Sequence, residues 1–454
     1  MTDANGKASS RAGETDSHTR WNFAAIVAES TFFMSGLAWV DPVAVLPVFI
    51  GRLTPSTVIV GLVTVLQRLG WLLPPVFMAA VLGHRPRRLP WLRWPVLLGR
   101  LPFMAFVVYL WLSGVSRPDV VIPFMIVAFA SVSLGNGLLG ISWQDIIAKS
   151  IPSGLRGRFF GAMQFATAVA VFMVGFVVRW MLGPGGPGFP REYTILFSLT
   201  AVFLTFSIIG CWLVREPIRP VLDRPQSVRE VLLGAIPLLR ENRAFRSLVL
   251  VALLGFGMSY AAPFYMVYAK QELHVRDELA GVYIWAATAG SALASLWWGH
   301  LNDRRGPRAV VRGAAVLIAV TPLLALSFLP AIAAASSVLP ALHCALPYLF
   351  SSVFFISGTM AGATWMGSTN YLFDLASHPE RPRYIALLNL LTAPGALAPL
   401  LIGWLLNYLA FPLVFALMAA FGGAAALIAL RMPAAVAPQR LLDTAAAEGE
   451  PVGI

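Results

Sequence analysis

Residues 193–214 read YTILFSLTAVFLTFSIIGCWLV, a stretch without a single charged side chain. A helix needs about 20 consecutive, mostly apolar residues to cross the hydrocarbon core of a bilayer. Since no water is present there, the backbone of such a stretch must satisfy its own hydrogen bonds, and this predicts an α-helix. Similar stretches recur along the whole chain of 454 residues, of which 58% are hydrophobic and 12% charged. Soluble domains carry about 25% charged residues, so the sequence predicts an all-α membrane protein.

The apolar stretches predict twelve transmembrane helices, six on each side of a charged central loop at residues 215–246. The predicted spans are Phe23–Ile50, Ser56–Leu82, Trp91–Leu112, Val120–Ile147, Phe159–Leu182, Tyr193–Val214, Ser247–Tyr268, Leu279–Leu301, Val310–Pro330, His343–Leu375, Tyr384–Leu406 and Phe411–Leu430. The tenth span is long enough to include an interfacial turn. Within the central loop, Val228–Leu239 is predicted to lie as an amphipathic helix on the membrane surface.

The chain is therefore predicted to have five parts: a disordered tail (1–20), a first six-helix bundle (21–214), the central loop (215–246), a second six-helix bundle (247–431) and a second disordered tail (432–454). Short sequence matches in the same order indicate that a six-helix unit was duplicated, which predicts two pseudo-symmetric bundles. The matching segments are Pro47–Phe49 with Pro263–Tyr265, Gly83–His84 with Gly299–His300, and Arg156–Phe159 with Arg381–Tyr384.

The formal net charge of +12 is distributed unevenly across the predicted membrane. Most Lys and Arg residues fall in the tails, in the central loop and in the loops that follow spans 2, 4, 8 and 10. By the positive-inside rule, both termini are therefore expected in the cytoplasm. No dense basic face with base-reading side chains is visible in the sequence, so nucleic acid is not an expected partner. The abundance of Arg, Ala, Gly and Pro indicates a bacterial source, and thus a bacterial inner (plasma) membrane.

The sequence shows no motif for catalysis or for a cofactor. Its six His residues are scattered singly, and Cys211 and Cys344 fall in different halves near opposite membrane faces. Neither a disulfide nor a metal site is expected from that arrangement. No Gly-x-x-x-x-Gly-Lys-Ser/Thr phosphate loop occurs. We therefore predict no cofactor, no metal and no enzymatic activity.

Residues 299–308, in the loop between spans 8 and 9, read GHLNDRRGPR. This segment resembles the G-x-L-x-D-R-x-G-x-R signature of the major facilitator superfamily. The resemblance implies the fold of that family and a gating role for the motif residues Gly299, Asp303, Arg304, Gly306 and Arg308. Gly299 is expected to allow a close helix approach, and Asp303 to accept hydrogen bonds from Arg side chains or a helix N-terminus.

The first-half copy of this motif, residues 83–88, lacks the acid and the second glycine, so a symmetric latch is not expected. Arg156-Gly157-Arg158 and Glu216-Pro217 also resemble common features of this family. Span 5 contains no proline, whereas proton-driven drug exporters of the family usually carry a Gly-Pro-rich motif there. The resemblance therefore argues against a drug antiporter.

Two acids recur at equivalent places in the two halves and suggest a cytoplasmic gate. Asp145 precedes Arg156 and Arg158, as Asp374 precedes Arg381 and Arg383. An acid beside a basic loop is expected to form gate ion pairs.

Ionisable side chains within a membrane are costly unless they face a cavity or a partner, so each is a candidate site. Glu29 and Asp41 lie in span 1, about 120° apart around a helix, so they are not expected to share a face. Glu29 is either a protonatable coupling group or a structural partner of Arg100. Asp41 either has a function or reaches the outer interface. Arg68 either binds an anionic substrate or pairs with a carboxylate of span 1, and Arg100 is expected to snorkel.

Aromatic side chains and amides in several spans suit stacking against, and hydrogen bonding to, a small organic ligand. Helix packing is the alternative for each of them. The candidates for lining the cavity are Asn136, Trp143 and Gln144 in span 4, Tyr260 and Tyr265 in span 7, Trp365 and Asn370 in span 10, and Asn389 in span 11. Gly358 and Gly362 are expected to mark a close contact between helices.

These observations predict a monomeric secondary active transporter, surrounded by lipid, that moves a small organic solute by alternating access. Coupling, where present, is expected to be to protons, because carboxylates occur within the membrane and no nucleotide-binding motif does. A transporter-like sensor or scaffold without transport, and a polytopic lipid-modifying enzyme, are the alternatives.

Overall fold

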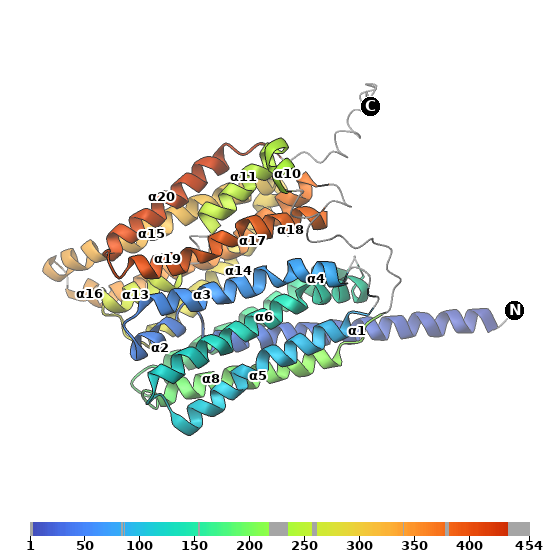
Figure 1. Cartoon of the computed structure of the whole chain (residues 1–454), viewed down its shortest axis with the longest axis horizontal. Coiled ribbons are helices and arrows are strands. Elements are labelled where there is room, and N and C mark those ends of the chain that lie inside the picture. The colour runs from blue at the N-terminus through green and yellow to red at the C-terminus, as the bar shows by residue number, and fades with distance from the viewer. Residues whose placement is uncertain are drawn as a thin grey trace. The chain divides into compact units, whose positions relative to one another are not determined.

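The computed structural model describes residues 3–82, 85, 87–152, 155–217, 235–256, 261–338, 340–376 and 381–434. Every regular element in these ranges is a helix (Figure 1). Ten of these helices are long and apolar enough to cross a membrane. The all-helical membrane class is thus confirmed. The number twelve stays a prediction, because the first and seventh predicted spans are both interrupted.

Contacts divide the chain into two compact units. The first unit comprises Met1–Val45 and Leu66–Gln226, and the second comprises Leu46–Val65 and Ser227–Ile454. This division differs from the predicted halves at one place. Residues 46–65 belong to the first half by sequence but pack within the second unit.

The first predicted span is broken in the structure. Helix α1 (Asp3–Ala38) and helix α2 (Leu46–Leu53) are separated by turns. Asp41 Oδ1 accepts hydrogen bonds from the backbone N–H groups of Val43 and Ala44, at 2.9 and 2.7 Å. This Asx turn, followed by a proline that lacks an N–H group, competes with helical hydrogen bonding. The prediction of one continuous span was therefore wrong.

Helix α1 begins at Asp3 and so includes most of residues 1–20, for which the sequence predicted a disordered tail. No proline precedes Pro42, so every residue before it has the backbone N–H group that a helix uses. The segment 435–454 of the second predicted tail lies outside the described residues.

The remaining helices up to the central loop follow the predicted spans, except that the second span, predicted as one helix, is divided between α3 and α4. They are α3 (Thr57–Leu72), α4 (Pro74–Leu82), α5 (Leu89–Ser113), α6 (Pro118–Ser150), α7 (Arg156–Met181) and α8 (Arg191–Leu213). Helices α5, α6 and α8 lie side by side, with α1 against α8 (Figure 1). Small residues permit this packing. A Cβ on Gly99 of α5 would lie 2.8 Å from the carbonyl oxygen of Ser131 in α6.

The second unit contains several short and irregular helices. They are α10 (Ala235–Glu241), α11 (Arg243–Val251), the π-helix η2 (Ala252–Phe256), α13 (Pro263–Gln271), α14 (Leu279–Arg305), α15 (Pro307–Val338), α16 (Pro340–Leu349), α17 (Ser351–Leu375), α18 (Arg381–Thr392), the 3-10 helix η3 (Ala393–Leu397), α19 (Ala398–Leu405) and α20 (Phe411–Leu430). The predicted interfacial helix overlaps α10 from Ala235, and its earlier residues 228–234 lie outside the described part. The tenth span is divided at Phe350, between α16 and α17.

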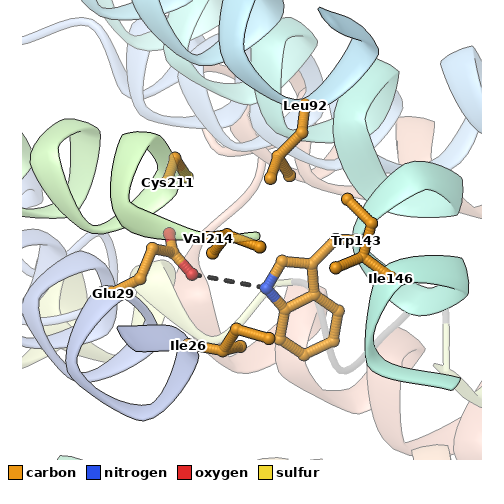
Figure 2. A pocket seen from close by; sticks show the side chains of 7 residues that line it. All are labelled: Ile26, Glu29, Leu92, Trp143, Ile146, Cys211 and Val214. Carbon is orange, nitrogen blue, oxygen red and sulfur yellow. Dashed lines mark hydrogen bonds between the residues drawn. The ribbon is translucent and has the colours of Figure 1, made fainter. Parts of the chain in front are cut away.

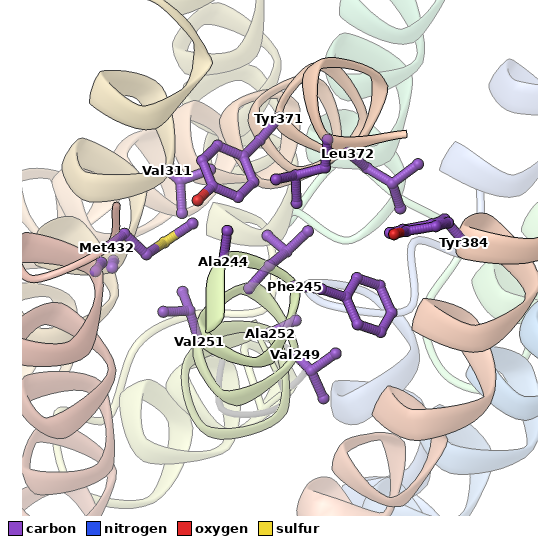
Figure 3. Close-up of a cluster of buried hydrophobic side chains, with 14 of the residues drawn as sticks. Ala244, Phe245, Val249, Val251, Ala252, Val311, Tyr371, Leu372, Tyr384 and Met432 are labelled. Carbon is purple, nitrogen blue, oxygen red and sulfur yellow. The ribbon is translucent and has the colours of Figure 1, made fainter. Parts of the chain in front are cut away.

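A buried cluster joins α11, α17, α18 and α20 (Figure 3). Phe245 meets Tyr384 edge to face, with ring centres 5.2 Å apart. Tyr371 donates its hydroxyl hydrogen to the carbonyl oxygen of Pro433 at 2.9 Å, which satisfies its polar group at the edge of the cluster. The cluster thereby fixes the end of α20 against α17.

Helices α14 and α17 touch backbone to backbone. A Cβ on Gly358 would lie 1.9 Å from the carbonyl oxygen of Ala287, and one on Gly290 would lie 2.1 Å from that of Phe355. The predicted close contact is confirmed for Gly358. It is wrong for Gly362, because no atom of the described residues would lie within 4 Å of a Cβ there.

Candidate functional site

A buried carboxylate and a buried guanidinium face each other inside the first unit. Glu29 of α1 is 7% exposed and Arg100 of α5 is 1% exposed. Glu29 Oε1 lies 3.9 Å from Arg100 Nη2. Glu29 is about 10 Å along the helix from Asn22, whose side chain bonds to Ser150 and to the backbone of Arg215 where α6 and α8 end. The ion pair therefore lies well inside the helical bundle.

Three neutral donors surround the Glu29 carboxylate. Ser207 of α8 donates its hydroxyl to Oε1 at 2.8 Å, while the Trp143 indole N–H and the Ser30 hydroxyl donate to Oε2 at 3.3 and 3.2 Å. A Cβ on Gly210 would lie 2.8 Å from Glu29 Cβ, so the glycine brings α8 close enough for Ser207 to reach the carboxylate.

The Arg100 guanidinium is held by groups of a different kind. Its Nη1 donates to the carbonyl oxygen of Leu204 at 3.1 Å, and its Cζ lies 5.2 Å from the centre of the Phe33 ring. Its Nη2 is buried and has no hydrogen-bond partner among the described residues. The prediction that Arg100 snorkels was therefore wrong, because a carboxylate at the same depth provides a partner that makes burial tolerable.

A small cavity lies beside the carboxylate (Figure 2). Its volume is about 10 Å³, close to the space that a single water molecule requires. Its lining residues are Ile26, Glu29, Leu92, Trp143, Ile146, Cys211 and Val214. The Trp143 indole points across it toward Glu29 (Figure 2). Apart from Glu29 and the Trp143 indole N–H, the side chains that line this cavity are apolar or a thiol.

The sequence singled out Glu29, Trp143 and Arg100 but missed Ser207. A weak signal was present. Ser207, Gly210 and Cys211 follow one another at helical spacing in span 6, and such spacing puts them on one face.

The other charged candidates, Asp41 in predicted span 1 and Arg68 in predicted span 2, lie in different surroundings from Glu29. Asp41 caps the turn between α1 and α2 and does not join Glu29. Arg68 lies on an exposed face of α3, whereas the cation beside Glu29 is Arg100.

Within each unit, the predicted cavity-lining residues have different surroundings. Asn136 donates to the carbonyl oxygen of Val132 in its own helix, and Gln144 is exposed on α6. Tyr265 is 4% exposed, with its ring centre 5.3 Å from that of Phe415. This contact favours the packing alternative for Tyr265, while Tyr260 lies outside the described residues.

The candidates on α17 and α18 also differ from one another. Trp365 is 74% exposed, and Asn389 is partly buried on α18. Asn370 donates to Asn302 Oδ1 at 3.3 Å, and Asn302 lies in the motif at the end of α14. Asn370 therefore supports the motif segment.

Asp145, which was predicted to form ion pairs in a cytoplasmic gate, has other partners in the structure than the sequence predicted. Asp145 accepts hydrogen bonds from Arg88 Nε at 3.0 Å and forms a 2.7 Å ion pair with Lys149 Nζ. Glu216 accepts from the backbone N–H groups of Arg88 and Leu89, at 2.8 and 2.9 Å. The expected pairing of Asp145 with the Arg-x-Arg loop is not found in the described part. Arg158 is exposed. The side chain of Arg156 lies outside the described part, and so do those of Arg381 and Arg383, which were expected beside Asp374.

The motif at residues 299–308 forms the end of α14 and the start of α15. Gly306 has φ 75°, and its N–H donates to the carbonyl oxygen of Asn302 at 2.8 Å. Only glycine adopts this conformation without strain, which explains its place in the motif. Asp303 and Arg304 are exposed and Arg308 is partly buried. Gly299 was expected to allow a close helix approach. A Cβ built on Gly299 would meet no atom of the described residues within 4 Å, so the described part of the chain shows no close approach there.

Comparison with known proteins identifies the fold. The crystal structure of a D-xylose–proton symporter is similar with TM-score 0.66 and 14% identity, over 91% of this chain and 98% of that one. That of an auto-inhibited peptide transporter of the POT family gives TM-score 0.65 and 12% identity, over 90% and 96%. That of the nucleoside transporter NupG gives TM-score 0.60 and 16% identity, over 91% and 98%.

These identities are low, so the likeness establishes the fold and leaves the substrate open. No curated protein matches the chain by sequence. The sequence model of the Major Facilitator Superfamily matches residues 30–339 and 248–451. Together the two matches span nearly all of the predicted membrane-embedded part. This chain belongs to the major facilitator superfamily.

Proposed function

We propose that this protein is a secondary active transporter that moves a small organic solute by alternating access, with Glu29 as its proton-coupling group. The observation that carries the proposal is the Glu29–Arg100 pair, whose charged atoms lie 3.9 Å apart inside the first unit. Family membership supports transport, and the similar structures include transporters for a sugar, a nucleoside and a peptide. The distribution of Lys and Arg supports a location of both termini in the cytoplasm, and the abundance of Arg, Ala, Gly and Pro supports a bacterial plasma membrane.

The geometry suits a group that gains and loses a proton. At 3.9 Å the two charges attract each other without sharing a hydrogen bond,. The interaction amounts to about 4 kcal/mol at an effective dielectric constant of about 20. A rearrangement of α5 against α1 that separated the two side chains would remove this attraction and thereby favour proton binding to Glu29. The small cavity beside the carboxylate provides room for a water molecule that delivers the proton,.

The test is transport into proteoliposomes with the variant Glu29→Gln, which keeps the shape of the side chain and cannot ionise. Labelled pentoses, nucleosides and dipeptides, chosen after a thermal-shift screen, serve as probes. We expect accumulation driven by a proton gradient to be lost, while exchange of solute across the membrane is retained. Asp119→Asn is the matched control, because that carboxylate is exposed and pairs with the neighbouring Arg117.

Unchanged gradient-driven uptake by Glu29→Gln would show that Glu29 is not the coupling group. Loss of exchange as well as accumulation would point to a structural role. If the wild-type protein binds a probe in the thermal-shift screen and transports none, the sensor alternative gains the support that transport loses.

A further inference from the structure

A second buried carboxylate lies far from Glu29 in sequence, in the segment between α13 and α14. Asp277 has a side-chain exposure of 6% and accepts hydrogen bonds from Arg52 Nε at 3.2 Å and Arg52 Nη2 at 2.5 Å. Lys270 at the end of α13 donates to its other oxygen, Oδ1. One acid is therefore shared by two cations, which come from different halves of the sequence.

Arg52 lies in the last turn of α2, within the segment 46–65 that packs in the second unit. Two further contacts hold this segment. Thr57 donates its hydroxyl to the carbonyl oxygen of Gly403 at 2.6 Å. A Cβ on Gly61 would lie 2.3 Å from the carbonyl oxygen of Pro399. Segment 46–65 thus touches α19 backbone to backbone, and the ion pair with Asp277 closes its end.

Arg52 and Lys270 contact the Asp277 carboxylate with different geometries. Arg52 approaches the carboxylate with two nitrogens, a geometry that gives both strength and orientation. Its side chain remains 49% exposed, so water can replace the acid when the pair separates. Lys270 belongs to the same unit as Asp277 by sequence as well as by contacts. If Arg52 moves away, Lys270 stays beside Asp277 and keeps the buried carboxylate paired with a cation. A buried carboxylate without a cation would be costly, and that cost would oppose the release of Arg52.

We propose that Asp277 is a latch that holds segment 46–65 against the rest of the second unit while the outer side of the transporter is closed. Release of Arg52 lets the segment move and opens the passage to the outside. The predicted topology puts the loop after span 1 and the loop after span 7 on the side opposite the termini. This inference rests on the proposed alternating-access cycle, but it concerns different residues and a different step from proton coupling at Glu29.

The experiment measures whether segment 46–65 opens. Val60, 4% exposed, is replaced by cysteine as a reporter in a background carrying Cys211→Ser and Cys344→Ser. The rate of alkylation by a membrane-impermeant maleimide, added outside intact cells, reports exposure of position 60. No solute is added, so the measurement is independent of knowing the substrate.

We expect Arg52→Gln to raise the alkylation rate about fivefold, the change that corresponds to loss of a partly exposed ion pair worth about 1 kcal/mol. Charge reversal by Arg52→Asp together with Asp277→Arg should return the rate toward that of the parent. Lys270→Gln should raise it much less, since Lys270 does not bind segment 46–65. Arg276→Gln is the matched control, because Arg276 pairs with Glu278 and not with Asp277.

An unchanged rate in Arg52→Gln would overturn the latch, as would an equal rise in the Lys270 and Arg276 variants. Reversal that fails to lower the rate, while both single variants fold and reach the membrane, would also overturn it. The proposed function fails by a different result, namely the absence of solute flux in the wild-type protein. The alkylation rates are measured without flux, so the two failures are distinguishable.

Discussion

The buried pair of Glu29 and Arg100 makes a prediction about stability that can be tested apart from transport. Replacing Arg100 with methionine keeps an unbranched side chain of similar length and removes the charge, which leaves the Glu29 carboxyl group buried without a cation. Removal of one partner of a buried ion pair costs about 3–5 kcal/mol. Glu29→Gln leaves Arg100 unpaired instead, with its Nη2 already lacking a hydrogen-bond partner among the described residues. Each single variant should therefore be destabilised.

The double variant Glu29→Gln with Arg100→Met should lose less stability than the two single variants combined. A separation of 3.9 Å gives a Coulomb energy of about 4 kcal/mol at an effective dielectric constant of about 20. The hydroxyl and indole groups that donate to Glu29 compensate for part of this Coulomb energy. We therefore expect a coupling energy of about 2–4 kcal/mol between Glu29 and Arg100 in a double-mutant cycle. The free energies of unfolding are measured by SDS titration in mixed micelles. Additivity within about 0.5 kcal/mol would refute the reasoning.

Two glycine substitutions test the packing and the backbone of the fold. Gly137→Ala should destabilise the protein by about 1–3 kcal/mol, because its Cβ would lie 2.0 Å from the carbonyl oxygen of Gly70, whereas Gly140→Ala, with no described atom within 4 Å, should be neutral. Thermal unfolding of both in detergent checks this, and equal midpoints would contradict it. Gly306→Ala should cost about 1–3 kcal/mol because it places a side chain at φ 75° and ψ 170°, a conformation that is essentially restricted to glycine,. Gly299→Ala, its control in the same motif, should leave the unfolding midpoint unchanged.

The apolar runs predicted helix positions well where no competing signal interrupted them. Phe411–Leu430 was predicted with the same ends that α20 has, since the run is continuous and starts beside a proline. Span 1 failed because the run contains Asp41 and Pro42, and the Asx turn at Asp41 breaks the helix without changing the apolar composition. Hydropathy measures the solvent that a segment prefers and is insensitive to a local turn of this kind.

The candidate site shows where sequence patterns end. The pairing of Glu29 with Arg100 was one of two alternatives, and choosing between them required knowing that α1 and α5 bring both side chains to one depth. Arg100 was expected to snorkel because an isolated charge in a membrane does so. Gly299 was expected at a close contact, yet in the described structure the space beside it is open. Each of these depends on distances between helices, which a single sequence does not encode locally.

The packing of residues 46–65 has a consequence for biogenesis. During synthesis these residues leave the ribosome long before α13 and α19, the helices that they contact. A nascent chain that ends at the central loop therefore lacks the neighbours of residues 46–65, which cannot reach their final packing before α13 and α19 are made. Maturation of this segment must wait for insertion of those two helices, so fragments comprising the first half alone should be preferred targets of membrane quality-control proteases.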